Sequence, residues 1–285
     1  MSSDTFSLLI EQLLRTHTDI RTFVLYHAGE PFLNKNFFEF VDIIKSHWPE
    51  SFVKTVSNGS LLSETLIDQI VSSQLDQIQI SIDGTSPYHS DEIRRGSNTM
   101  KLISNINSLA LAVQNSSSSL SVEISTTQFF SQEQLSGTPF TTQPNASWLR
   151  EYITHNLPII STWAMKWPRV DLPDMYRIRS YDDPSVPTEY ATYCDHVCNT
   201  ITIRSDGSVV PCCYDLLGDL NMGNIHSQII SEIWNSVPYN DLRVQIRNSQ
   251  PCLTCKNCNT IRKRKFFLEL SSAKADAHSS SSYKD

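Results

Sequence analysis

The seven cysteines are the residues of this chain whose type and spacing are best suited to chemistry. All of them follow residue 193, and three stand close together in the segment QPCLTCKNCNT, residues 250–260. The full set is Cys194, Cys198, Cys212, Cys213, Cys252, Cys255 and Cys258. We expect a cytosolic protein, in which thiols stay reduced, and an odd number of cysteines does not close into a set of disulfides. The cysteines therefore predict metal ligands or redox groups rather than cross-links.

Four of these cysteines have a spacing that brings their sulfurs together: Cys194, Cys212, Cys252 and Cys255. The segment ITIRSDGSVVPCCYD, residues 201–215, alternates apolar residues around an Asp206-Gly207 turn, and so predicts a β-hairpin that brings the first two cysteines near each other. The CxxC pair supplies two more sulfurs from a single turn. Four thiolates suit either a tetrahedral zinc ion or a 4Fe–4S cluster, and the spacing does not choose between the two.

The other three cysteines, Cys198, Cys213 and Cys258, are interpreted as buried or spare thiols. Cys258 follows Cys255 at the spacing at which Cys255 follows Cys252, so it could compete with either of them for a ligand position. Asp215 stands beside the thiols and is a candidate acid or base, although we favour a surface or hydrogen-bonding role for it.

A second group of polar residues follows three successive apolar segments, in the turns HAGEP (27–31), SNG (57–59) and SIDG (81–84). Each turn taken singly is explained by turn formation, but the carboxyl ends of parallel strands share one face, where α/β folds bind ligands. Glu30 could take an ammonium group, and Arg94 or Arg95 could clamp a carboxylate. The candidate residues are Gly29, Glu30, Asn58, Ser81 and Arg94. Together they suit a zwitterionic, amino-acid-like ligand.

The elements that must position these residues alternate along the chain. We expect strands over 22–31, 51–59, 76–84, 119–127 and 158–167. We expect helices over 5–16, 34–48, 63–74, 98–114 and 146–156. Strands that alternate with long helices predict βαβ units and a parallel sheet, which is an α/β fold. The chain enters on a helix, although a crossover helix normally follows a strand.

Composition marks the boundaries between regions of the chain. We divide it into an α/β domain (1–165), a proline-rich and charged linker (166–190), a cysteine-rich lobe (191–270) and a serine-rich disordered tail (271–285). Residues 128–145 are polar and read as a loop or lid. Within the lobe, SEIWNSVPYNDLR (231–243) predicts a helix that is capped by Ser231.

The charge balance argues against two classes of partner. Lys and Arg number 23 and Asp and Glu number 30, which gives a net charge of −7. A chain with a net negative charge is not expected to bind nucleic acid or a membrane surface, which are themselves negatively charged. No stretch approaches the length of apolar residues that spans a bilayer, so we expect no membrane partner.

Two parts of the chain resemble one known family. The pattern YHAGEPFLN…VSNGSLL…ISIDGTSPYHSDEIRRG resembles the radical S-adenosylmethionine (SAM) superfamily. The pattern DGSVVPCCYDLLGDLNMGNI…EIWN…LR…PCLTC resembles the SPASM or twitch domain that some of its members carry. The resemblance covers residues 20–110 and 190–258, and it implies a (β/α)6 barrel followed by a small β-hairpin lobe.

The resemblance also implies roles for particular residues. The loop at Gly29 and Glu30 would contact the amino group of SAM, and Asn58 would line the pocket. Ser81 and Arg94 would hold the ribose and carboxylate ends of SAM. In the lobe, the implied ligands of one auxiliary 4Fe–4S cluster are Cys194, Cys212, Cys252 and Cys255.

The chain departs from the family in one important respect. Family members hold a first 4Fe–4S cluster on a CxxxCxxC loop after the first strand, whereas residues 1–193 here contain no cysteine. Because strand and loop are missing together, we interpret the barrel as partial and the N-terminus as incomplete; the alternative is a degenerate protein that makes no radical. SAM with a second 4Fe–4S cluster is expected only if that segment is present. We expect the chain as it stands to be inactive in SAM cleavage.

Three functions remain open at this point. The first is a radical SAM/SPASM-type iron–sulfur oxidoreductase or maturase, which generates a 5′-deoxyadenosyl radical for hydrogen abstraction from a peptide or small-molecule substrate. A reductant such as ferredoxin or flavodoxin would serve it. The second is a non-catalytic relative that acts as a metal-stabilised binding or scaffold protein. The third is an interaction protein that is stabilised by zinc.

Overall fold

The computed structural model describes residues 1–16, 19–129, 144, 146–167, 171, 176–180, 189–263 and 266–270. The chain divides into two compact units. The first consists of Met1–Gln128, Pro144–Thr162 and Ser205–Gly207, and the second takes in the remaining residues.

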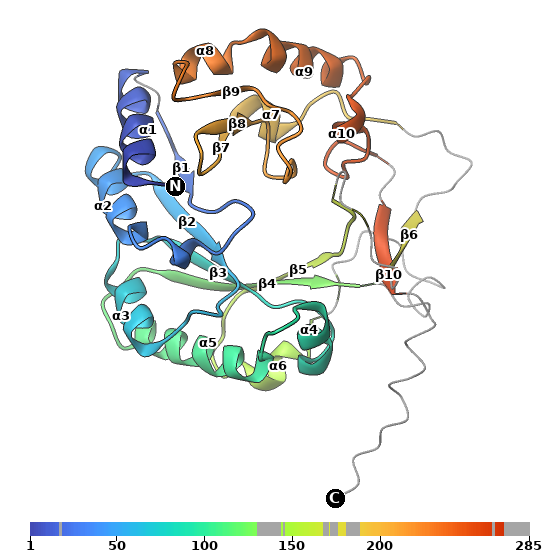
Figure 1. Cartoon of the computed structure of the whole chain (residues 1–285). Coiled ribbons are helices and arrows are strands. Elements are labelled where there is room, and N and C mark those ends of the chain that lie inside the picture. The colour runs from blue at the N-terminus through green and yellow to red at the C-terminus, as the bar shows by residue number, and fades with distance from the viewer. Residues whose placement is uncertain are drawn as a thin grey trace, which may run out of the picture. The chain divides into compact units, whose positions relative to one another are not determined.

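A five-stranded sheet forms the centre of the first unit (Figure 1). Its strands, in spatial order, are β1 (Thr22–Val24), β2 (Phe52–Ser57), β3 (Gln77–Ser81), β4 (Ser121–Gln128) and β5 (Ile159–Trp163). Strands β1 to β4 pair in parallel, and β5 lies beside β4. The parallel sheet confirms the predicted α/β class, and it places the carboxyl ends of β1, β2 and β3 at one edge.

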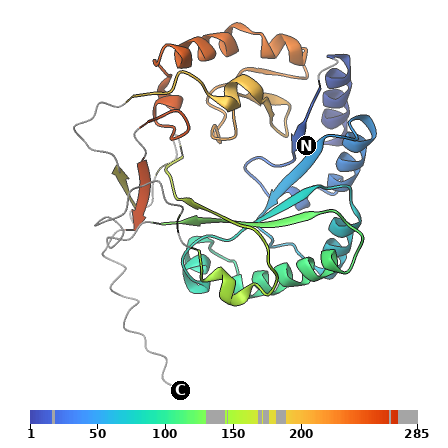
Figure 2. The same cartoon turned by 180° about the vertical axis from the view of Figure 1, so that it is seen from behind.

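Helices cover one face of this sheet, as Figures 1 and 2 show from opposite sides. The longer ones are α1 (Ser3–Arg15), α2 (Phe37–His47), α3 (Glu64–Ser72) and α5 (Thr99–Gln114). Shorter turns of helix are η1 (Pro31–Leu33), α4 (Pro87–Ile93) and α6 (Leu149–Tyr152). The predicted helices are confirmed, although α6 is a single turn where residues 146–156 were expected to be helical.

Local sequence explains why these elements form. The side chain of Ser63 caps α3 by accepting a hydrogen bond from the Leu66 N–H at 3.3 Å. Along β3 apolar and polar residues alternate, and Ile78 and Ile80 are completely buried. Helix α1 turns Phe6 into the core, where its ring stacks on that of Phe40 at a centroid distance of 3.9 Å. The first unit therefore has a continuous apolar core between sheet and helices.

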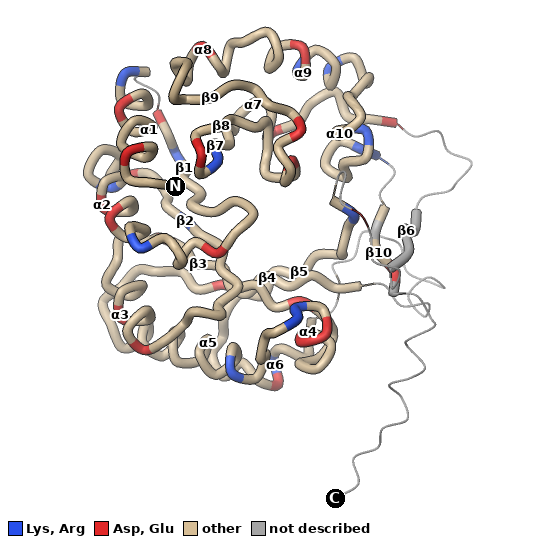
Figure 3. Tube along the Cα trace, in the orientation of Figure 1, with Lys and Arg blue, Asp and Glu red and all other residues tan. Residues whose placement is uncertain are grey.

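Charged residues of both signs are scattered over the helices of the first unit (Figure 3). Helix α2, for example, carries Glu39 in its first turn and Lys45 and His47 in its last turn. That distribution matches the charge preference of a helix dipole. It presents no run of basic residues on these helices that would attract nucleic acid.

The second unit contains two small antiparallel sheets. One is formed by β7 (Thr202–Ile203), β8 (Ser208–Val210) and β9 (Gly223–Asn224). The first two strands form the predicted hairpin, with Gly207 at φ +80° in its turn, a conformation that favours glycine. The other sheet pairs β6 (Tyr176–Ser180) with β10 (Phe266–Leu270). Strand β6 lies within residues 166–190, the range that the sequence predicts to be a linker.

The described residues of the second unit also form the helices α7 (Asp195–Asn199), α8 (Ile230–Trp234), α9 (Val237–Arg247) and α10 (Leu253–Lys256). The prediction of a single helix capped by Ser231 is wrong. Helix α8 has Ile229 as its N-cap and ends before α9 begins. The break follows from Pro238, which lacks an N–H and clashes with the carbonyl four residues before it, so it stands in the first turn of a new helix.

Several sequence predictions fall on residues outside the described ones. These are most of the loop or lid at 128–145, most of the linker and the tail at 271–285. None of the helices in the described ranges has both the length and the apolar character that a membrane crossing needs.

Candidate functional site

The carboxyl ends of β1 and β2 are joined through Glu30. One carboxylate oxygen accepts a hydrogen bond from the Ser57 hydroxyl at 2.8 Å, and the other accepts one from the Asn58 N–H at 2.8 Å. Glu30 is also the N-cap of η1, where its side chain accepts a weaker bond from the Phe32 N–H at 3.4 Å. The structure thus brings Glu30 and Asn58 together, and it holds the carboxylate in a fixed position at the sheet edge.

The backbone around this carboxylate is tightly constrained. Ala28 adopts a positive φ of +49°, so the turn before Glu30 is left-handed at a residue with a side chain. Gly59, with φ +68°, follows β2. A Cβ at this glycine would lie 2.4 Å from the Leu102 side chain and 3.0 Å from that of Ile80, so only glycine fits the close packing there. In contrast, a Cβ at Gly29 would meet only a carbonyl oxygen at 3.8 Å, and this leaves space beside Glu30.

The carboxyl ends of β3 and β4 carry a second set of contacts. The hydroxyl groups of Ser81 and Ser125 share a hydrogen bond of 3.1 Å across the two strands. Arg94, which follows α4, places Nε at 3.0 Å and Nη2 at 2.8 Å from one oxygen of Asp83. The other Asp83 oxygen accepts the Thr127 N–H at 2.9 Å. Ser81 and Arg94 are thus both at the end of β3, but each is bound to a neighbour rather than to the other.

The Asp83–Arg94 pair bears directly on the predicted role of Arg94. The sequence assigns its guanidinium to a ligand carboxylate, whereas in the structure it is already neutralised by a carboxylate of the protein. Both groups are only partly exposed, so the ion pair is less screened than one on the open surface. A ligand carboxylate would have to share Arg94 with Asp83.

The loop after β3 is fixed by a tryptophan that lies far along the chain. The Trp148 indole Nε1–H donates to the Gly84 carbonyl at 2.9 Å, and the Gly84 N–H donates to the Thr127 carbonyl at 3.0 Å. Trp148 directly precedes α6 and contacts the ring of Tyr152. These bonds hold the turn that carries Asp83.

The cysteines of the second unit come from three segments. Cys194 is the N-cap of α7, and Cys198 lies within that helix. Cys212 and Cys213 follow β8 after Pro211. Cys252 is the N-cap of α10, which contains Cys255, and Cys258 follows that helix. All seven are free thiols, and Cys194 and Cys258 are the two that are buried.

One arginine ties the helices of this unit together. The guanidinium of Arg243 on α9 lies 4.1 Å from the ring centroid of Trp234 and 4.8 Å from that of Tyr239. Its Nη1 donates to the Trp234 carbonyl at 2.8 Å, and its Nε donates to the Val197 carbonyl at 3.3 Å. Because Val197 lies on α7, Arg243 fixes the helix that begins at Cys194.

The thiols influence one another strongly. Burial raises the pKa of Cys212 to about 12, and nearby Cys213 and Cys258 contribute to the shift. Cys252 and Cys255 share a hydrogen bond, which lowers the pKa of Cys252 to about 6 and raises that of Cys255. Such a set of thiols, two of them buried and five partly buried, has the donor chemistry of a thiolate-ligated iron–sulfur cluster or zinc ion, because metal binding removes the repulsion between thiolates. The donor set therefore fits the group.

The positions of the possible ligand side chains are a separate question from their chemistry. Among the described residues, which include all seven cysteines, no three His, Cys, Asp or Glu side chains are arranged as ligands of one metal ion. In the first unit the donor set is absent altogether, since residues 1–193 contain no cysteine.

Of the two roles that we favoured for Asp215, the hydrogen-bonding role is confirmed and the surface role is wrong. Its exposed fraction is 2%, and its two carboxylate oxygens accept the N–H groups of Asp219 and Leu220, each at 2.9 Å. Its own N–H donates to the Cys212 carbonyl at 3.2 Å. Asp215 therefore organises the turn that follows Cys212 and Cys213.

Sequence reasoning missed several residues of the first site: Ser57, Asp83, Ser125, Thr127 and Trp148. The signal for Asp83 was available, because it stands in the SIDG turn and carries a charge opposite to that of Arg94. Ser57 was likewise adjacent to Asn58. Ser125, Thr127 and Trp148 lie far along the chain, and nothing in their local sequence indicates their partners.

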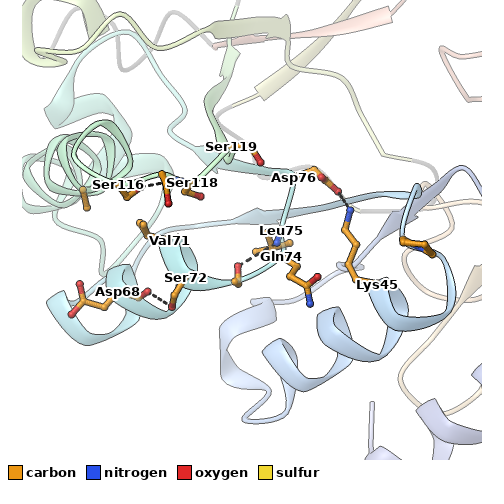
Figure 4. A pocket seen from close by; sticks show the side chains of 14 residues that line it. Lys45, Asp68, Val71, Ser72, Gln74, Leu75, Asp76, Ser116, Ser118 and Ser119 are labelled. Atoms are coloured by element: carbon orange, nitrogen blue, oxygen red, sulfur yellow. Dashed lines mark hydrogen bonds and ion pairs between the residues drawn. The ribbon is translucent and has the colours of Figure 1, made fainter.

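A pocket of about 760 Å³ lies at the other edge of the sheet (Figure 4). It is lined by the residues that precede β3 and β4, together with Lys45 from α2. Figure 4 shows Lys45 reaching Asp76, and the two form an ion pair of 2.7 Å. Asp76 also accepts the Val53 N–H at 2.7 Å, so the pair ties α2 to the amino ends of β2 and β3. We assign this pocket a structural role.

Comparisons with solved structures agree on the fold. BtrN in complex with AdoMet (SAM) and 2-DOIA matches with a TM-score of 0.54 and 19% identity, over 91% of this chain and 80% of that chain. Native anSMEcpe with bound AdoMet matches with a TM-score of 0.57 and 12% identity, over 90% and 86%. The form of anSMEcpe with AdoMet and the Kp18Cys peptide gives 0.51 and 14%, over 97% and 86%. At these identities the likeness shows a shared fold. A comparison with curated proteins finds no match.

Two family models match the two candidate sites separately. The model of the radical SAM superfamily matches residues 3–121, which contain Glu30, Asn58 and Arg94. The model of the SPASM iron–sulfur cluster-binding domain matches residues 194–259, which contain all seven cysteines. The chain therefore has a radical SAM domain over residues 3–121 and a SPASM domain over residues 194–259.

Proposed function

We propose that this chain binds SAM in its first unit and carries one auxiliary 4Fe–4S cluster in its second unit. We propose that it acts in the reaction of a radical SAM/SPASM-type oxidoreductase or maturase. The observation that carries the proposal is the Glu30 carboxylate, which is fixed by Ser57 and Asn58 at the carboxyl ends of β1 and β2. We propose a barrel domain over 1–165, a linker over 166–190 and the cluster domain over 191–270.

The first unit offers one charged group for the ammonium group of SAM and another for its carboxylate. Each oxygen of Glu30 accepts a bond from the protein, and carboxylate oxygens have lone pairs to spare, so Glu30 can also accept from an ammonium group. At Arg94, Nε and Nη2 are bound to Asp83, and the guanidinium has further N–H donors for the carboxylate of SAM. Gly29 leaves room for a ligand to approach the backbone.

The second unit offers the thiolates. Cys194, Cys212 and Cys255 would hold three irons, and the family resemblance gives Cys252 as the fourth ligand. When bound, an auxiliary cluster supplies one-electron chemistry or a site for substrate. The residues around it have separate tasks: Arg243 holds α7 in place, and Asp215 shapes the turn after Cys213.

The first unit does not fit the cluster with which family members cleave SAM. That cluster needs thiolates beside the SAM site, and residues 1–193 contain none. We therefore assign no radical-forming step to this chain. We expect it to bind SAM without releasing 5′-deoxyadenosine when it is incubated with dithionite.

The proposed substrate is a peptide or a small molecule. Both classes occur among the structures that share the fold, since BtrN was solved with 2-DOIA and anSMEcpe with a peptide. A reductant such as ferredoxin or flavodoxin would reduce the cluster. The net charge of −7 supports a partner other than nucleic acid.

Two measurements on the 285-residue chain test this proposal. Equilibrium dialysis with radiolabelled SAM should show saturable binding, with methionine and adenosine as control ligands that compete weakly. Anaerobic reconstitution should load iron and sulfide in equal amounts, with absorbance near 400 nm. Absence of SAM binding contradicts the first part, and stoichiometric zinc without sulfide contradicts the second.

A second candidate is a non-catalytic binding or scaffold protein that is stabilised by its metal site. It is favoured by the ion pair between Arg94 and Asp83, because the pair as a whole presents no net charge to an incoming ligand. A chain that loads metal in the cysteine lobe, but leaves SAM unbound at every concentration tried, would support this candidate over the first.

A further inference from the structure

Arg262 is a buried arginine of the cysteine lobe, at the start of the basic segment RKRKFF (262–267). Its exposed fraction is 8%, whereas the side chain of Lys263 next to it is 63% exposed. Arginine is almost never fully buried unless its charge is paired. The ion pairs found among the described residues do not include Arg262, and the carboxylate of Glu189 beside this segment is bound by Lys263 at 2.7 Å. Arg262 therefore carries a buried charge for which the described residues provide no ion-pair partner.

The guanidinium group of Arg262 is held by neutral partners. Its Nη2 donates to the Lys256 carbonyl at 2.5 Å and to the side-chain oxygen of Asn257 at 2.9 Å. The guanidinium carbon lies 4.3 Å from the centroid of the Phe266 ring. Nε is buried and has no hydrogen-bond partner among the described residues. These contacts fix the position of the positive charge, but they do not neutralise it.

The same contacts place the charge beside a segment that carries cysteines. Lys256 and Asn257, which bind the guanidinium group, stand between Cys255 and Cys258. The backbone N–H of Arg262 donates to the Cys258 carbonyl at 3.1 Å. Because adjacent Cα atoms are about 3.8 Å apart, the covalent chain keeps Nη2 within about 12 Å of either sulfur atom, whichever rotamer the cysteine adopts. A buried charge at such a distance is screened much less than a charge in water.

Capping of a helix explains only part of this arrangement. Lys256 is the last residue of α10, and a cation at the carboxyl end of a helix interacts favourably with the helix dipole. However, α10 has only 4 residues, so its dipole is small. Capping also requires neither the burial of Arg262 nor an N–H group at Nε that binds nothing, since an exposed side chain could donate to the same carbonyl. The burial of the charge is therefore the feature that needs a further explanation.

We propose that Arg262 supplies positive charge to the auxiliary cluster and raises the reduction potential of that cluster. The inference rests on the proposed auxiliary cluster and adds to it a residue that is not a ligand. A 4Fe–4S cluster with four thiolate ligands has a net negative charge, and the electron that it accepts from a reductant makes this charge more negative by one. A buried cation nearby stabilises the reduced form more than the oxidised form. Arg262 acts through its charge alone, and none of its bonds changes.

Two variants of the full chain separate the charge of Arg262 from its packing. Arg262→Gln keeps N–H donors and loses the charge, whereas Arg262→Lys keeps the charge. After anaerobic reconstitution, the midpoint potential of the cluster is measured by reductive titration followed by electron paramagnetic resonance. In Arg262→Gln we expect the equilibrium constant for reduction to fall at least tenfold, which is about 59 mV for one electron. In Arg262→Lys we expect less than half of this shift.

Arg247→Gln is the matched control. Arg247 is an exposed arginine at the end of α9 in the same lobe, and water and salt screen its charge. The potential should therefore be unchanged in Arg247→Gln. An unchanged potential in Arg262→Gln, or shifts of equal size in Arg262→Gln and Arg262→Lys, would overturn the inference.

Iron and sulfide are measured in each variant before its potential, so that a loss of folding is recognised. If Arg262→Gln binds no cluster and Arg262→Lys binds one, the need for a positive charge is supported by the loading itself. If both variants fail to bind a cluster, packing rather than charge is what Arg262 supplies, and the inference is overturned. If the unmodified chain binds no iron and sulfide, the proposed auxiliary cluster fails and the inference fails with it. A loaded chain whose potential does not respond to Arg262 contradicts the inference alone.

Discussion

The strand-edge site of the first unit is held together by bonds within the protein, whereas the cysteine lobe gathers thiols that repel one another once ionised. In the first, Glu30 is bound by Ser57 and Asn58, and Arg94 is bound by Asp83. In the second, burial and neighbouring thiols hold the pKa of Cys212 at about 12. The first site can thus form before its ligand arrives, while the second gains its charge balance from a metal.

The two units also differ in the length of their strands and in the size of their apolar cores. Strands β3 and β4 have 5 and 8 residues and pair over most of their length, and they carry completely buried isoleucines. Strands β7 and β9 have 2 residues each. A large apolar core stabilises the first unit by itself, whereas small, short-stranded domains usually depend on cross-links or metals. The predictions below test this difference, from the largest expected effect to the smallest.

Loss of a ligand should unfold the cysteine lobe and spare the first unit. We expect Cys212→Ala to abolish cluster loading, because it removes a thiolate from the ligand set. Hydrogen exchange should then rise to that of an unfolded chain over 194–259 and stay unchanged over β2, β3 and β4. Cys213→Ala is the control and should keep the cluster. Equal loss of cluster loading in both variants would contradict the assignment of Cys212, rather than Cys213, as the ligand.

Substitution of Gly59 should destabilise the first unit and spare the cysteine lobe. In Gly59→Ala the new Cβ meets the Leu102 side chain at 2.4 Å at a φ of +68°, so both overpacking and backbone strain oppose it. We expect the free energy of unfolding of the first unit to fall by about 2–4 kcal/mol. Gly96→Ala, at φ +84° with nothing within 4 Å, is the control and should cost about 1–2 kcal/mol. Urea titration followed by circular dichroism measures both, and an equal cost would exclude the packing component.

Neutralising Glu30 should weaken SAM binding more than it weakens the fold. In Glu30→Gln one of the bonds from Ser57 and Asn58 faces an amide N–H₂ group in place of an oxygen, and the charge that would attract an ammonium group is lost. We expect a loss of affinity of about tenfold to about a hundredfold, which calorimetric titration with SAM measures. Glu39→Gln, on the exposed side of α2, should leave the affinity unchanged. Unaltered affinity in Glu30→Gln would remove Glu30 from the site.

The smallest expected effect is a pH dependence near α4. Burial tends to raise the pKa of Asp91, but hydrogen bonds from Thr99 and Ser97 outweigh it and hold the pKa below its ordinary value of 3.8. A carboxyl group with a lowered pKa in the folded state adds stability above its ordinary pKa, and that stability is lost as the pH falls through the folded value. The difference in unfolding free energy between the unmodified chain and Asp91→Asn should therefore shrink between about pH 7 and about pH 3. A difference that stays constant over this range would show that the charge of Asp91 plays no part.

Much of the framework follows from local sequence. The alternation of Ile78, Ile80 and Ile82 predicts β3, and Ser63 predicts the start of α3 because its hydroxyl can cap the helix. The Asp206-Gly207 turn predicts the hairpin between β7 and β8. The failure at residues 231–243 was also local, because Pro238 was present in the sequence and signals a helix start as well as a helix break.

Many residues of the two candidate sites could also be predicted from the sequence, because reactive residue types that lie close together along the chain can be recognised there. What the sequence by itself determined is therefore the class of fold, the turns at the strand ends and the gathering of cysteines after residue 193. Only the tertiary structure decided which groups are partners: Arg94 with Asp83, Glu30 with Ser57, and the Gly84 carbonyl with Trp148. Two of these pairings, Glu30 with Ser57 and Gly84 with Trp148, join residues that lie far apart along the chain. The physical reason is that a parallel sheet and the elements packed on it bring distant residues together, and such packing leaves no mark in local spacing.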